Sequence, residues 1–97
     1  MDSLVDKVWD WFEEHDLHDP YMQYIKMVEE CGELAHELTR GNTDTIEVED
    51  AIGDILVTVI GMCHHLNLDA KECLEMAYNE IRNRKGKVVN GSFVKSE

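Results

Sequence analysis

The amino-acid sequence predicts an all-α fold, a four-helix bundle built as a single domain. The 97-residue chain contains one proline and six glycines, so few residues interrupt a helix. Apolar residues recur every three or four positions, and no segment alternates between apolar and polar residues in the manner of a strand. A domain of this size buries only about 60–65 % of its unfolded surface, so we also expect a homodimer or homotetramer.

The first two helices are expected over residues 3–15 and 20–40. Asp19 is a typical N-cap, and Pro20 suits the first helical position because its missing N–H has no helical partner there. Gly41 is a typical residue just after a helix end. The apolar stripe of the first helix is formed by Leu4, Val8, Trp11 and Phe12.

Two further helices and a tail follow. The third helix is expected over residues 46–65, and the fourth ends near Gly86. Asp69 and Glu72 resemble a capping box at the start of the fourth helix. The tail, residues 86–97, is too apolar to be fully solvated, so we expect it to pack on the bundle or on a partner copy.

The composition limits the partners and the compartment. Nine basic residues against 21 acidic ones give a net charge of −12, which repels phosphate backbones and argues against duplex nucleic acid as a partner. The longest apolar stretch, residues 55–63, is shorter than the ~20 residues of a membrane span. Cys31, Cys63 and Cys73 are odd in number and lie in apolar-periodic segments, which predicts buried thiols in a reducing, cytoplasmic environment.

The predicted second helix carries an acidic face. Four glutamates fall on the side opposite its apolar residues: Glu29, Glu30, Glu33 and Glu37. Like charges four residues apart each cost about 0.2–0.5 kcal/mol on an isolated helix, and only Lys26 lies nearby as a cation. A bound divalent cation would offset that repulsion. A solvated acidic face explains these four residues about equally well.

A second acidic stripe lies on the predicted third helix. Glu47, Asp50 and Asp54 are spaced three and four residues apart. Asp54 borders an apolar region, where a carboxylate must be paired, hydrogen-bonded or bound to metal to stay charged. Acidic stripes on two adjacent antiparallel helices predict a metal site. Beyond Asp54 the helix is apolar on nearly every side, so we expect it to be buried against other subunits. Because the acidic stripes adjoin this segment, the expected active sites lie near the subunit interfaces.

These motifs resemble a known family. The run from Lys26 to Ala35 and the Gly-Asp-Ile-Leu-Val sequence at residues 53–57 resemble the MazG-type all-α nucleotide pyrophosphohydrolases, whose hallmark is EExxE, a spacer and ExxD. The resemblance covers residues 23–86. It implies a MazG-like bundle that uses Mg²⁺, or Mn²⁺, to hold a nucleoside triphosphate for cleavage between the α and β phosphates. The implied metal ligands are Glu29, Glu30, Glu33, Asp50 and Asp54, and the first three are also the candidate catalytic residues.

The second motif departs from the family pattern. Ala51 stands three positions before Asp54, where the motif has a glutamate, and the nearest acid is Asp50. Spacings of three and four residues both keep a carboxylate on one helical face, so we expect Asp50 to replace the glutamate. Glu47 with Asp50 forms a literal ExxD one turn earlier, and this second register stays open.

The basic end of the predicted fourth helix is the candidate phosphate contact. The resemblance implies that an asparagine and basic residues in this region bind substrate, and Asn79 with Arg84 matches the family spacing. Ile81 stands where a lysine is usual, and Arg82 follows it. The candidate substrate-binding residues are Lys26, Asn79, Arg82, Arg84 and Lys85. Basic residues at a helix C-terminus also interact favourably with the helix dipole. This interaction accounts for the presence of any one of these basic residues about as well as substrate binding does.

Two functions follow from these motifs. The first is a Mg²⁺-dependent pyrophosphohydrolase that converts a nucleoside triphosphate to a monophosphate and pyrophosphate. The alternative is a non-catalytic acidic helical module that binds metal or nucleotide. The run Cys63-His64-His65 is interpreted as a buried cysteine beside surface histidines, because adjacent positions diverge on a helix and no second ligand pair accompanies them.

Overall fold

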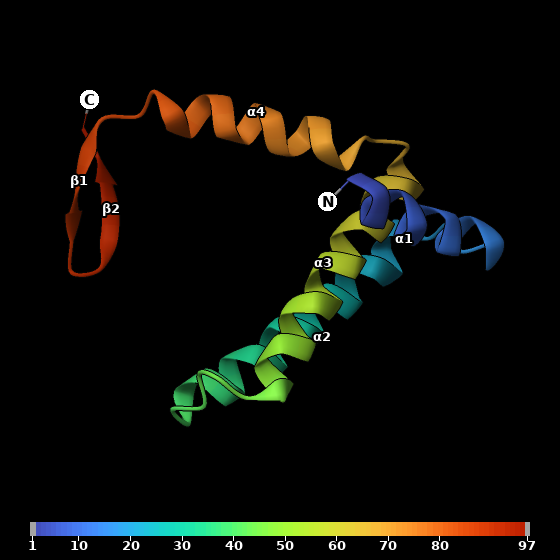
Figure 1. Cartoon of the computed structure of the whole chain (residues 1–97), viewed down its shortest axis with the longest axis horizontal. Helices are drawn as coiled ribbons and strands as arrows, with labels where there is room; N and C mark the ends of the chain where they lie inside the picture. Colours follow the sequence, from blue (N-terminus) through green and yellow to red (C-terminus); the bar gives the residue numbers. More distant parts are fainter. Residues whose placement is uncertain (1, 97) are drawn as a thin grey trace.

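Residues 2–96, which a computed structural model describes, form four helices and one two-stranded antiparallel sheet (Figure 1). The elements are α1 (Asp2–Glu14), α2 (Pro20–Thr39), α3 (Ile46–Leu66), α4 (Ala70–Arg82), β1 (Gly86–Val89) and β2 (Ser92–Lys95). The four predicted helices are confirmed. The hairpin was not predicted, and Met1 and Glu97, which the predicted domain includes, lie outside the described residues.

Side-chain caps fix where the helices begin. The Asp19 carboxylate accepts hydrogen bonds from the backbone N–H groups of Tyr21 and Met22, at 3.0 and 3.3 Å, and so satisfies two free donors of α2. Thr45 caps α3 through the N–H of Val48 in the same manner. Asp69 caps α4 through two N–H groups, as its sequence position predicts.

The helix ends follow backbone conformation. α2 ends at Thr39 with Arg40 as its C-cap, and the following Gly41 has a φ of +81°, which glycine adopts without steric cost. α3 ends where Asn67 takes the left-handed conformation, with φ +56°. α4 ends at Arg82, about one turn earlier than the predicted end near Gly86, because Gly86 already belongs to β1.

The antiparallel helices α2 and α3 form the central packing unit of the chain (Figure 1). The side of α2 that is partly shielded from solvent combines apolar, neutral polar and acidic residues: Met27, Leu34, Gln23, Glu30 and Glu37. On α3 the buried residues include Val48, Ala51 and Thr58. The expected separation of a buried apolar face from an outer acidic face on α2 is therefore wrong. Tyr24 is 56 % exposed and Val28 is 50 % exposed in the single chain.

Helix α1 packs on the C-terminal part of α3. Phe12 is the anchor, with only 2 % of its surface exposed, and its ring lies over Gly61. A Cβ at Gly61 would stand 2.5 Å from Cζ of that ring, so the contact requires glycine. Of the predicted apolar stripe, Leu4 and Trp11 remain exposed.

A closed four-helix bundle is not formed within one chain. After the left-handed turn at Asn67, α4 extends away from the α2–α3 pair (Figure 1). Cys63 of α3 lies beside Cys73 of α4, and burial raises the pKa of the Cys63 thiol. The prediction of buried thiols is right for Cys63 and wrong for the other two cysteines, Cys31 and Cys73, which are exposed. All three are free thiols.

The tail forms a hairpin that stands off the helices of its own chain (Figure 1). Asn90 and Gly91 form its turn with φ values of +50° and +80°, as a two-residue hairpin turn requires. Both strands are exposed along their length. Packing of this tail on its own bundle is thus absent among residues 86–96, and packing on a partner copy stays a prediction. No helix within residues 2–96 has the length and apolar character needed to cross a membrane.

Candidate functional site

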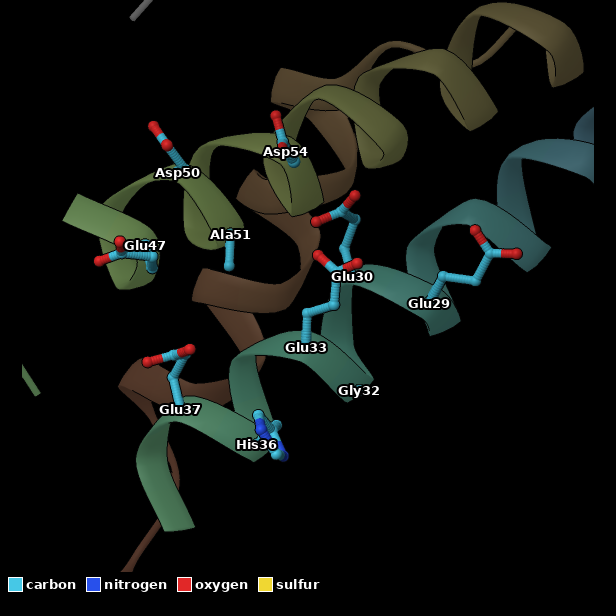
Figure 2. A pocket seen from close by; sticks show the side chains of 10 residues that line it. All are labelled: Glu29, Glu30, Gly32, Glu33, His36, Glu37, Glu47, Asp50, Ala51 and Asp54. Atoms are coloured by element: carbon cyan, nitrogen blue, oxygen red, sulfur yellow. The ribbon is translucent and has the colours of Figure 1, made fainter. Parts of the chain in front are cut away.

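An acidic cleft of about 840 Å³ lies between α2 and α3 (Figure 2). The residues around it are Glu29, Glu30, Gly32, Glu33, His36, Glu37, Glu47, Asp50, Ala51 and Asp54. Seven of these ten residues carry a carboxylate. The antiparallel packing of α2 on α3 therefore brings the two acidic stripes of the sequence to one place.

The most crowded pair in the acidic cleft is Glu30 and Glu33. Both side chains point from α2 toward α3 (Figure 2). The pKa of Glu30 is raised, first by partial burial and then by the negative charges of Glu33 and Asp54 and a hydrogen bond with Glu33, while Lys26 one turn away opposes the shift. Loss of solvation and neighbouring negative charge both favour the protonated carboxyl group. A cation in the cleft would reverse this preference.

The other three predicted ligands also line the acidic cleft. Asp50 and Asp54 project from the same side of α3, and Glu29 stands apart from the Glu30–Glu33 pair (Figure 2). The structure thus places all five predicted metal ligands around one cavity. Their role in binding metal stays a prediction.

Ala51 occupies the position on α3 that faces α2 (Figure 2). It is 5 % exposed, and its methyl group points toward the glutamates of α2. The motif glutamate that the sequence lacks would therefore enter the middle of the cleft. Glu47 and Asp50 both line the cleft from neighbouring turns, so both registers of the second acidic motif remain available.

Apart from Glu47, which the second register includes, sequence reasoning left out two lining residues with possible ligand side chains. Glu37 continues the i, i+4 series of Glu29 and Glu33, which was the available signal. Its carboxylate accepts a 2.8 Å hydrogen bond from Nδ2 of Asn42, which orients it. His36 also lines the cleft, at the end opposite Glu29.

The predicted phosphate contacts of α4 are not at the acidic cleft of the same chain. The cleft-lining residues all belong to α2 and α3. At the end of α4, Arg84 donates a 3.0 Å hydrogen bond to Glu80, and the Arg82 guanidinium lies 5.9 Å from the centre of the Tyr78 ring. Among the five candidate substrate-binding residues, only Lys26 interacts with a residue of the cleft.

The donor set fits a hard divalent cation. Carboxylate oxygens dominate the lining, and Mg²⁺ and Mn²⁺ prefer such oxygens over sulfur or imidazole nitrogen. The pKa of Glu30 is raised first by burial and then by the negative charges of Glu33 and Asp54, against the opposing effect of Lys26. The chemistry of the cleft therefore matches a site that binds a metal and, through it, an anionic substrate.

Comparison with known proteins agrees with this chemistry. The model of the MazG nucleotide pyrophosphohydrolase domain family matches residues 18–89. An uncharacterized 18.2 kDa protein from the rep-hol intergenic region of Haemophilus phage HP1 is 29 % identical over 73 residues. That match covers 72 % of this chain and 44 % of the phage protein, so the chain spans less than half the length of this relative. No solved structure matches the chain.

Proposed function

The chain belongs to the family of MazG nucleotide pyrophosphohydrolase domains, and from this premise we propose that it is a Mg²⁺-dependent nucleoside triphosphate pyrophosphohydrolase. The substrate is a ribo- or deoxyribonucleoside triphosphate, and the products are the monophosphate and pyrophosphate. One observation carries the proposal: acidic residues of two antiparallel helices line a single cleft.

Glu30, Glu33 and Asp54 are the central residues for holding the cation. Glu30 interacts with both of the others, since the charges of Glu33 and Asp54 raise its pKa. Glu29 and Asp50 lie at the margins of the same cleft and complete the proposed ligand set. A bound Mg²⁺ or Mn²⁺ would neutralise phosphate charge and polarise the phosphoryl oxygens.

Hydrolysis requires an oriented water molecule. The water oxygen attacks the α phosphorus, the bond to the bridging oxygen breaks, and pyrophosphate leaves with the electron pair. A carboxylate takes the proton that water loses. Glu29 stands apart from the Glu30–Glu33 pair, so among the three catalytic candidates its carboxylate is the most available for this step (Figure 2).

A second copy of the chain completes the site in this proposal. The acidic cleft contains no basic residue apart from His36, whereas a triphosphate needs counter-charge beyond the metal. The basic end of α4, with Asn79, Arg84 and Lys85, lies away from its own cleft and is available to the cleft of a partner. On the outer face of α3, Ile52 and Leu56 are 48 % and 51 % exposed, which suits burial in a homodimer or homotetramer.

The alternative function is nucleotide or metal binding without turnover. Ala51 favours this alternative, because it removes a carboxylate from the position that faces the α2 glutamates (Figure 2). In that case the acidic cleft binds the metal and the triphosphate, but the phosphates are not positioned for attack.

The test is an assay of pyrophosphate release from a panel of nucleoside triphosphates with Mg²⁺. We expect turnover by the unmodified chain and its loss in Glu30→Gln and Asp54→Asn. Glu49→Gln is the matched control, since Glu49 is an exposed acid of α3 that does not line the cleft. Nucleotide binding without pyrophosphate release supports the alternative function. Full activity of Glu30→Gln and Asp54→Asn contradicts the proposed mechanism.

A further inference from the structure

Three histidines meet where α1 and the α1–α2 turn pack on the last turn of α3. His18 comes from the turn between α1 and α2, and His64 and His65 come from the last turn of α3. One ring nitrogen from each histidine lies within 4.8 Å of the others. Ten residues separate Asp54 from His64, which is about 15 Å along an α-helix, so this histidine cluster is distinct from the acidic cleft.

The histidine cluster is buried on its α3 side. Only 2 % of the His64 side chain is exposed, and its ring packs against Trp9 and Phe12 at centroid distances of 4.9 and 6.0 Å. This finding corrects the interpretation of His64 as a surface histidine. The Nδ1 atoms of His64 and His65 are 3.0 Å apart.

Two buried nitrogens of the cluster lack hydrogen bonds. Nε2 of His65 is shielded from solvent and has no partner. Nε2 of His64 lies 3.0 Å from a carboxylate oxygen of Glu13, but without hydrogen-bond geometry. Most buried polar atoms in folded proteins are paired, so the buried ring of His65, whose Nε2 has no partner, is available to a ligand.

Carboxylates flank the histidine cluster in the manner of a metal site. A carboxylate oxygen of Glu13 lies beside Nε2 of His64. A carboxylate oxygen of Asp16 lies 2.8 Å from Nε2 of His18. In metal sites a carboxylate commonly holds one nitrogen of an imidazole ring, which fixes the tautomer and leaves the other nitrogen for the metal. Both His64 and His18 have such a carboxylate neighbour.

We propose that His18, His64 and His65 bind one Zn²⁺ ion, which joins the α1–α2 turn to the end of α3. Three neutral imidazoles suit Zn²⁺ better than Mg²⁺, and a water molecule can occupy a fourth position. Zn–N bonds of about 2.0–2.1 Å require nitrogens about 3.3 Å apart in a tetrahedron. The present separations approach this value for His64 and His65, and rotation of the exposed His18 ring closes the remainder.

The first experiment is a Zn²⁺ titration of the full chain after removal of metal with a chelator. Excess Mg²⁺ is present, so that the acidic cleft does not contribute to the signal. We expect one Zn²⁺ per chain and a rise in the melting temperature, because a metal that binds the folded state stabilises it. Absence of Zn²⁺ binding overturns the proposal.

Variants locate the bound Zn²⁺. Outer-shell partners account for about 10–100-fold in affinity, so we expect that loss for Glu13→Gln and at least ~100-fold for His18→Gln or His65→Gln. His15→Gln is the control, since His15 stacks on Trp11 outside the cluster and should leave affinity unchanged. His18 is more than half exposed, with 55 % of its side chain accessible, so its replacement leaves the fold intact, as far-UV circular dichroism will check.

Two results overturn the assignment to the histidines. One is unchanged affinity in both His18→Gln and His65→Gln. The other is loss of Zn²⁺ binding in Glu30→Gln with full binding in the histidine variants, which places the ion in the acidic cleft. Neither result bears on pyrophosphate release, so this inference and the proposed function fail independently.

Discussion

The replacement of Gly61 by alanine tests how α1 is held on α3. The added Cβ would lie 2.5 Å from Cζ of Phe12 and 2.9 Å from both Cε atoms. Carbon atoms in contact normally lie about 3.5–4.0 Å apart, so the ring must move by about 1 Å or more. Phe12 is 2 % exposed and its ring is rigid, so it cannot yield as the end of a flexible side chain would.

The expected magnitude follows from two opposing effects. Overpacking a filled site costs about 1–3 kcal/mol. Alanine in place of glycine within a helix returns about 0.8–1.0 kcal/mol. The difference for Gly61→Ala therefore runs from about zero to a loss of about 2 kcal/mol. Gly53→Ala on the same helix is the control, because its added Cβ meets no atom within 4 Å. We expect it to stabilise the chain by about 0.8–1.0 kcal/mol.

The assay is urea unfolding of both variants at one protein concentration, followed by circular dichroism. The two changes are chemically identical, yet their midpoints should move in opposite directions. A third variant, Phe12→Leu combined with Gly61→Ala, should recover part of the loss, because the smaller side chain leaves room for the methyl group. If Gly61→Ala stabilises as much as Gly53→Ala, Phe12 does not pack over Gly61.

Three further predictions concern the acidic cleft and assembly. Because the pKa of Glu30 is raised above its usual 4.5, this carboxyl group keeps its proton to higher pH in the folded metal-free chain than in the unfolded chain, and its contribution to stability should be lost as pH rises through the raised pKa. Urea unfolding at a series of pH values measures this loss of stability, which should be smaller in Glu30→Gln and in saturating Mg²⁺. If the free energy of unfolding depends on pH to the same extent in all three cases, Glu30 does not lie among crowded negative charges. Ala51→Glu should destabilise the metal-free chain and increase the Mg²⁺-induced rise in melting temperature; a Mg²⁺ response equal to that of the unmodified chain would mean that position 51 does not face the cation. Leu56→Glu, at an exposed apolar position, should convert the proposed oligomer to monomer in sedimentation, and an unchanged sedimentation coefficient would exclude this face from the interface.

The local features of the fold could be predicted because local residues determine them. Asp19, Pro20 and Asp69 mark helix starts through hydrogen bonds or backbone geometry within a few residues. The convergence of the acidic stripes was also predictable, since two long helices joined by a short loop pack antiparallel. The hairpin turn at Asn90-Gly91 carried an equally local signal in its dipeptide, but its strands are too short for an alternation pattern.

The features that sequence reasoning missed depend on which elements meet. Helical periodicity identifies residues that share a face, but it does not identify the helix that packs on that face. The glutamates of α2 were therefore placed on the side opposite its apolar residues, whereas Glu30 and Glu37 share the side shielded by α3 with Met27 and Leu34. The histidine cluster was missed for the same reason, because His18 joins His64 only through the packing of the α1–α2 turn on α3.

The arrangement of α2 links the candidate chemistry to assembly. Its shielded side carries carboxylates that repel one another, while its more apolar side, with Tyr24 and Val28, stays exposed in the single chain. Within one chain this orientation leaves apolar side chains exposed and brings negative charges close together, in a molecule that already has a net charge of −12. Two events would offset this cost: a cation between α2 and α3, and a second copy on the exposed apolar faces. We therefore expect Mg²⁺ binding and oligomerisation to stabilise the chain through different surfaces, so the Mg²⁺-induced gain in stability should survive in Leu56→Glu.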